Sequence, residues 1–189
     1  MKKTIPLLMV VLLILGNLLF ADSTPTQLPV LEAPVLIVSA GQSPGALQFS
    51  VVAKMAKLPH QFEKLLKAED FDPTKYKTLV LVVGASSKGL GAAGIDIEEE
   101  VKRVIALAEK AKANKIPVVI CHLEGGTRRG PMSDRILDAL APYASIFLVK
   151  TDSDKDGKFK TLSENLKVPI VYFEKTSDLK GIIQQYFIY

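Results

Sequence analysis

The sequence predicts an α/β protein with a doubly wound, mainly parallel sheet of five to six strands and helices on both faces. Flavodoxin-like and Rossmann-like folds have this architecture. Short apolar segments of six or seven residues alternate along the chain with longer segments whose apolar residues recur at helical spacing. Apolar and polar residues do not alternate in these segments, as they would in a strand with one solvent-exposed face. The segments therefore suit strands that are buried on both faces of a parallel sheet.

The elements follow in a regular order. Apolar strands are predicted at 34–40, 78–84, 116–122, 145–150 and 168–174. Helices are predicted at 45–58, 96–114, 132–143, 159–167 and 177–187. Ser43 and Pro44 are a favourable start for the first of these helices. The helix at 96–114 has the strongest pattern, with acids in its first turn and lysines in its last. Residues 60–66 are ambiguous and are assigned as a short edge strand.

The first 21 residues are typical of a secretory signal peptide. Lys2 and Lys3 precede an apolar run at 5–20, and Ala21 supplies a small residue for cleavage. We therefore expect an exported protein, periplasmic or extracellular, that starts near Asp22 and has no membrane span after cleavage. The alternative is an uncleaved membrane anchor, because the run approaches the length of a span.

The remaining composition suits one ordinary domain. Removing 21 of the 189 residues leaves 168, and the loss of two lysines lowers the net charge from +4 to +2. Residues 22–33 are predicted to form a tether, and 34–189 a single domain. No basic run is interleaved with aromatics, so nucleic acid is not an expected partner. Cys121 is the only cysteine, which excludes an internal disulfide and suits a small core residue.

The polar residues gather in loops that follow the strands. Ligands of doubly wound folds bind beyond the carboxyl ends of the strands, where the strand order reverses. If 60–66 is the edge strand of a flavodoxin-like order, this switch point lies between the strands that end at Ala40 and Gly84. Ligand contacts are expected from Ser39, Gln42, Ser43, Gly84, Ser86, Ser87, Lys88, Gly89, His122, Arg128 and Arg129.

The stretch GASSKGLG (84–91) looks like a nucleotide loop but lacks its chemistry. A Walker-type loop needs Lys and a hydroxyl residue after its last glycine, whereas Leu90 and Gly91 follow Gly89. The stretch is also similar to the glycine turn of short-chain dehydrogenases, but it lies on a later strand and no Tyr-x-x-x-Lys pair follows on a helix. Its free N–H groups and Lys88 would instead form a nest for a carboxylate or phosphate. The alternative is a wide turn capped by serines.

The stretch HLEGGTRRG (122–130) holds two adjacent arginines behind paired glycines. Arg128 and Arg129 suit bidentate contact with a carboxylate or phosphate. In the alternative, one arginine pairs with Glu124 or Asp134 and the other is solvated. His122 and its neighbour Cys121 should point to opposite faces of a strand, so they are poor partners for thiol catalysis.

The stretch TDSDKDG (151–157) begins like a calcium loop. Its candidate ligands are Asp152, Asp154 and Asp156. The glutamate that would complete the loop is absent, because Ser163 holds its position and Glu164 comes one residue later. Calcium is the one cofactor that the sequence suggests, and an Asp-rich polar turn is the alternative.

Three stretches carry a resemblance to a known family: VSAGQSPGA (38–46), TLVLVVGASSKGLGAAGIDIEEEVKR (78–103) and GGTRRGPMSD (125–134). They resemble an exported bacterial family catalogued only as a domain of unknown function. The resemblance covers nearly the whole mature chain and implies an extracytoplasmic α/β domain. It brings no activity, cofactor or catalytic residue.

We therefore expect binding of a small anionic molecule, a carboxylate or phosphate, in a crevice at the carboxyl edge of the sheet. Lys88 with Arg128 or Arg129 would supply its positive charge. One alternative is an extracytoplasmic hydrolase or transferase that uses a loop serine or His122. For that alternative the chain offers only two histidines as candidate bases. Another alternative is a structural envelope protein with no ligand.

Overall fold

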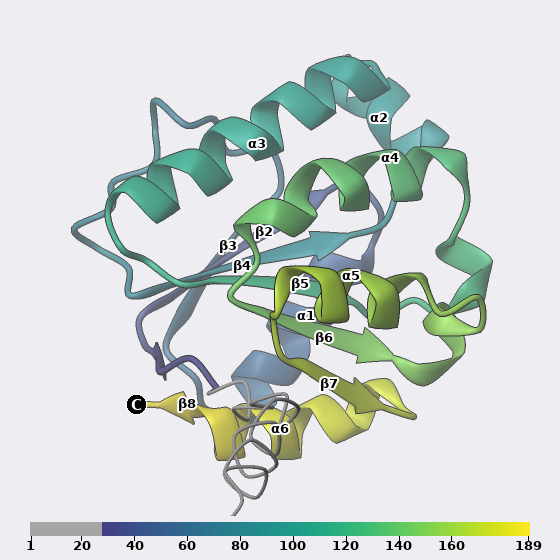
Figure 1. Cartoon of the computed structure of the whole chain (residues 1–189). Coiled ribbons are helices and arrows are strands. Elements are labelled where there is room, and N and C mark those ends of the chain that lie inside the picture. The colour runs from purple at the N-terminus through teal and green to yellow at the C-terminus, as the bar shows by residue number, and fades with distance from the viewer. Residues whose placement is uncertain (1–27) are drawn as a thin grey trace, which may run out of the picture.

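The computed structural model describes residues 28–189, so the predicted signal peptide lies outside the described residues. Six parallel strands form the main sheet, in the order β3-β2-β4-β5-β6-β7 (Figure 1). They are β2 (Val35–Ala40), β3 (His60–Glu63), β4 (Thr78–Val83), β5 (Val118–His122), β6 (Ile146–Lys150) and β7 (Ile170–Phe173). Helices cover both faces, which confirms the doubly wound α/β fold.

The strand order places the switch point where the sequence predicted it. Val35 of β2 pairs with His60 of β3 on one side and with Thr78 of β4 on the other. The chain runs outward from β2 to β3 and then crosses back over β2 to β4. The loops after β2 and β4 therefore leave the same edge of the sheet in diverging directions.

Two hydrophobic cores lie on opposite faces of the sheet. Helices α1 (Gly45–Met55) and α6 (Leu179–Tyr186) cover one face, and α3 (Ile97–Ala113), α4 (Pro131–Leu140) and α5 (Lys158–Leu166) cover the other (Figure 1). Adjacent strand residues such as Leu36 and Ile37 belong to different cores, because side chains alternate along a strand. Helix α3 begins with a capping box between Asp96 and Glu99.

Three short elements correct the sequence prediction. β1 (Leu31–Glu32) pairs with β8 (Phe187–Ile188), and Leu31 is buried, so the tether predicted at 22–33 extends too far into the domain. The glycine loop continues as helix α2 (Ser87–Ala93), which the sequence analysis missed.

Single-turn 3₁₀ helices lie at Gly126–Arg128, Ala141–Tyr143, Thr151–Asp154 and Thr176–Asp178. No helix within residues 28–189 combines the length and apolar character needed to span a bilayer.

Candidate functional site

The loops after β2 and β4 pack backbone against backbone at the switch point. The N–H of Ser43 donates to the carbonyl of Gly84 at 3.2 Å, and that of Ser86 donates to the carbonyl of Gly41 at 2.8 Å. A Cβ on Gly41 would lie 2.4 Å from the oxygen of Gly84, so this approach requires glycine. These two loops meet at the same edge of the sheet, and main chain fills the space between them.

The open nest predicted for the glycine loop does not form. The N–H of Ala85 donates to Ser133 Oγ at 2.9 Å, and the N–H of Gly89 donates to Ser86 Oγ at 3.1 Å. Ser86 thereby caps α2, so the alternative of a serine-capped turn describes this loop better. Ser87 and Lys88 are exposed in the first turn of α2, and no ion pair in the described part of the chain involves Lys88.

A buried carboxylate that the sequence analysis did not identify holds the loop after β2. Glu100 of α3 is fully buried and accepts from the N–H of Gly41 at 2.7 Å and from Gln42 Nε2 at 3.1 Å. Arg103 pairs with Glu100 at 2.8 Å and donates to the carbonyl of Ser39 at 2.6 Å. Gln42, at φ 62°, is thus held in a left-handed conformation that few non-glycine residues adopt. A sequence signal existed, because Glu100 lies on the apolar stripe of α3.

The side chains of Ser39 and Gln42 are both buried, at 1% and 3% exposure. Ser39 Oγ and Gln42 Oε1 have no hydrogen-bond partner in the described part of the chain. Gln42 contributes to the site mainly by tying the loop after β2 to Glu100 and to the carbonyl of Lys64.

Three side chains that we call the switch-point cluster, Ser43, Glu124 and Arg128, meet above the ends of β2, β4 and β5. Ser43 Oγ donates to Glu124 Oε2, and Arg128 Nε donates to Glu124 Oε1 at 3.3 Å. Arg128 Nη1 also donates to the carbonyl of Ala85 at 3.3 Å. A Cβ on Gly84 would lie 2.7 Å from Glu124 Oε2, so this glycine makes room for the carboxylate.

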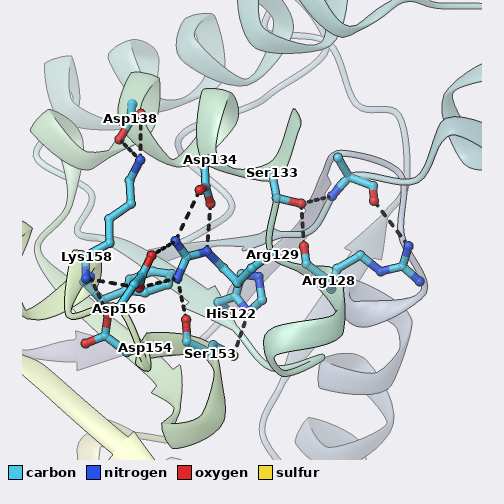
Figure 2. Close-up of polar contacts among 12 residues, drawn as sticks. His122, Arg128, Arg129, Ser133, Asp134, Asp138, Ser153, Asp154, Asp156 and Lys158 are labelled. Atoms are coloured by element: carbon cyan, nitrogen blue, oxygen red, sulfur yellow. Dashed lines mark hydrogen bonds and ion pairs between the residues drawn. The ribbon is translucent and has the colours of Figure 1, made fainter. Parts of the chain in front are cut away.

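Arg129 turns away from Arg128 toward α4 and α5 (Figure 2). Its guanidinium donates to Asp134 at 2.7 and 3.2 Å, to Asp156 at 3.1 and 2.9 Å, and to the carbonyl of Ser153. Its centre lies 5.3 Å from the ring of Phe159. Hydrogen bonding to Asp134 raises the pKa of Arg129, and hydrogen bonding to Arg129 lowers the pKa of Asp156. The guanidinium of Arg129 is therefore committed to groups of the fold, which leaves Arg128 as the arginine with unused donors.

His122 is a core residue rather than a ligand contact. It is fully buried, its Nδ1 lies 3.0 Å from Ser153 Oγ, and its ring packs edge-on against Phe159 with centroids 5.7 Å apart. Burial, together with the charge of Arg129, lowers the pKa of His122 to about 4. Cys121 lies in the core of the opposite face, as the strand geometry predicted, and burial raises the pKa of its thiol.

The three aspartates of the calcium-like loop serve separate partners. Asp154 accepts from the N–H groups of Phe159 and Lys160 at 2.7 and 3.0 Å, and so caps α5. Asp156 pairs with Arg129, and Asp152 lies 3.6 Å from the ammonium group of Lys150. Within residues 28–189, no three His, Cys, Asp or Glu side chains are grouped to hold a metal ion.

Two surface cavities flank the switch-point cluster. One, of about 340 Å³, is lined by Ala85, Thr127, Arg128, Arg129, Gly130, Pro131, Met132 and Ser133, and we call it the Arg128 cavity. The other, of about 290 Å³, is lined by Gln42, Ser43, Pro44, Leu47, Phe62 and Lys64. A larger cavity of about 410 Å³ lies along α3, where Leu65, Ile95 and Arg103 are among its lining residues. That cavity contains none of the predicted ligand contacts.

A family model described as a domain of unknown function (DUF6305) matches residues 32–187. No curated protein matches the sequence. A GDSL-like lipase from Bacteroides thetaiotaomicron is 14% identical over 77% of this chain and 71% of that chain, with a TM-score of 0.37. A mutant of the esterase AlinE4 is 13% identical over 72% and 73% of the two chains, with a TM-score of 0.31. Likeness at these values carries no argument about the chemistry of this chain.

Proposed function

The chain belongs to the DUF6305 family, a domain of unknown function, and we propose from its own side chains that it binds a small anionic molecule. The site would be the Arg128 cavity, at the carboxyl edge of the sheet. The ligand would carry a carboxylate or phosphate group. With the predicted signal peptide, binding would take place in the periplasm or outside the cell.

The unused donors of Arg128 carry this proposal. A guanidinium has five N–H donors, and Arg128 makes two hydrogen bonds to residues within 28–189, both at 3.3 Å. Its side chain is 35% exposed and borders the cavity. Arg129, in contrast, makes five hydrogen bonds and is 11% exposed, so its donors are already committed. Arg128 can therefore meet a carboxylate or phosphate without breaking the fold.

The cavity walls indicate the rest of the ligand. Pro131, Met132 and Ala85 provide apolar surface, and Thr127 adds an exposed hydroxyl. A volume of about 340 Å³ lies near the lower end of the range of small-molecule pockets. A molecule with one anionic group and a small apolar body fits this set of groups. Lys88 does not line the cavity, so Arg128 would provide most of the charge-assisted binding.

The hydrolase alternative has less support. His122 is buried beside Ser153, and His60 contacts Ser50 and the carbonyl of Leu58, so both histidines of the chain are engaged away from Ser43. Ser43 is the serine of a G-x-S-x-G sequence (41–45) between β2 and α1, and it donates to a carboxylate. That carboxylate already pairs with Arg128, and neither histidine contacts Ser43. A serine nucleophile needs a base that is free to take its proton, so the cluster suits binding better than catalysis.

Titration with a panel of small carboxylates and phosphates, followed by NMR chemical shifts, tests this proposal. Arg128→Met should weaken the best member of the panel by roughly ten- to a hundredfold, because one charge-assisted contact is lost. Arg135→Met is the matched control: Arg135 is an exposed arginine that pairs with Glu98 on α3, and its loss should leave affinity unchanged. A panel without any binder, or equal effects of the two variants, would refute the proposal and favour a structural envelope role.

A further inference from the structure

The outer side of α1 is apolar. Leu47, Val51 and Met55 follow one another every four residues and are 53%, 53% and 60% exposed. Residues at this spacing share one side of a helix. The inner side of the same helix packs Phe49 and Val52 into the core. A helix that is apolar on both sides is normally buried, so its exposed side is suited to contact with something outside the domain.

The apolar surface continues past the end of α1. Tyr189 Oη donates to the carbonyl of Ala56, which follows α1, at 2.7 Å. Ile188, beside Tyr189, is 63% exposed in β8. We call this set the α1 surface: Leu47, Val51, Met55, Ile188 and Tyr189.

The charged side chains of α1 and of the turn that follows it are lysines, and the nearest acid in space to Ile188 is Glu32, its partner in the β1–β8 pair. The sequence from 41 to 62 contains no Asp or Glu, and the nearest acids along the chain are Glu32 and Glu63. Lys54 and Lys57 lie exposed at the carboxyl end of α1. An apolar stripe flanked by lysines is typical of helices that lie in the interface of an anionic bilayer.

The described chain also begins beside this surface. Leu28 lies two residues before Val30. Residues 5–20 form an apolar run that would lie in a bilayer during export, or would remain there as an uncleaved anchor. The seven residues between them, 21–27, reach about 25 Å at most. A bilayer that holds residues 5–20 is therefore within about that distance of Leu28, which leads into β1 beside β8.

We propose that the α1 surface docks on a lipid bilayer with anionic headgroups. Leu47, Val51 and Met55 enter the boundary between headgroups and acyl chains, while Lys54 and Lys57 contact lipid phosphates. A second copy of the chain fits this surface less well. A two-fold contact joins a surface to itself, so it would bring these lysines of the two copies close together. This docking does not depend on a ligand in the Arg128 cavity.

Flotation of residues 22–189 with vesicles tests the docking without the apolar run at 5–20. The buried core residues in the described part of the chain all lie between Leu31 and Phe187, so the chain of residues 22–189 contains this core. It should float with vesicles of phosphatidylethanolamine and phosphatidylglycerol, and less with phosphatidylcholine. Replacing Leu47, Val51 and Met55 together by Gln should lower partitioning at least tenfold. Lys54→Gln with Lys57→Gln should lower it severalfold, on phosphatidylglycerol vesicles only.

Leu65→Gln with Leu166→Gln is the matched control. These leucines are 39% and 38% exposed, Leu65 borders the cavity along α3, and Leu166 ends α5 on the other face of the sheet. Their loss should not change partitioning, and all variants should keep the melting temperature of the parent chain. The docking would be disproved by a parent chain that stays off phosphatidylglycerol vesicles, or by a control that lowers partitioning equally. It would also be disproved if light scattering showed a dimer that the triple Gln variant abolishes.

Discussion

Arg128 and Arg129 are neighbours in the sequence, yet they belong to different kinds of site. Arg129 is enclosed by Asp134, Asp156 and the ring of Phe159, and its donors are all occupied (Figure 2). Arg128 makes two long contacts at the rim of an open cavity. The difference shows that adjacent arginines differ in their capacity to bind a ligand. That capacity depends on how many N–H donors of each side chain make no hydrogen bond within the fold. Arg129 stabilises the fold, and Arg128 is available to a ligand.

The largest expected effect tests this division directly. Arg129→Met should lower the free energy of unfolding by about 3 to 4 kcal/mol, because Asp134 and the carbonyl of Ser153 lose a largely buried partner. Arg128→Met should cost about 1 to 2 kcal/mol, since its contacts are long and its own side chain is 35% exposed, although Glu124 is 9% exposed. Urea unfolding of the two variants measures both values. Similar losses for the two variants would contradict the comparison.

The pH dependence of stability tests the enclosed region through His122. Its folded pKa of about 4 lies below its ordinary value of 6.5, so the unfolded chain takes up the proton first. The stabilisation from neutral His122 is present above pH 6.5 and is lost as the pH falls toward 4, by at most about 3 kcal/mol. Unfolding measured at a series of pH values should show this loss in the parent chain and in His60→Gln. His122→Gln should lack it, and an unchanged slope in that variant would rule out this origin.

A smaller effect is expected on the Arg128 side, from the close packing of the loops after β2 and β4. A Cβ on Gly89 would lie 2.1 Å from the carbonyl oxygen of Gln42, so Gly89→Ala should cost about 2 kcal/mol. Gly91 lies on the same short helix with nothing within 4 Å of an added Cβ. Gly91→Ala should instead raise stability by roughly 0.5 to 1 kcal/mol. Thermal unfolding of this matched pair distinguishes close packing from a general effect of alanine, and two variants of equal stability would speak against the packing.

The features that the sequence predicted well are those encoded locally. Buried strands read as unbroken apolar runs, and α3 shows both its capping residues and its stripe. The strand order followed once residues 60–66 were assigned as an edge strand, because that assignment determines where the chain reverses. Helix α2 was missed because two of its seven residues are glycines, which weaken a helical pattern.

The site was predicted only in part because its contacts are long-range. Glu100 meets Gly41 across 59 residues, and Arg129 meets Asp156 across 27. Nothing in the local sequence distinguishes these partners from solvated acids. The choice between Glu124 and Asp134 as arginine partner was left open, and the structure uses both. The topology predicts which loops lie at one edge of the sheet, but it does not predict the direction in which each side chain points.

The pairing of β1 with β8 has a consequence for the topology of the chain. Leu31 lies opposite Phe187, so the first and last elements of the domain are side by side. A short linker from Tyr189 to Leu28 would therefore make the backbone a ring without disturbing the sheet. Opening that ring at the exposed turn of Asn114 and Lys115 gives a permuted protein that starts with β5 and keeps both cores intact.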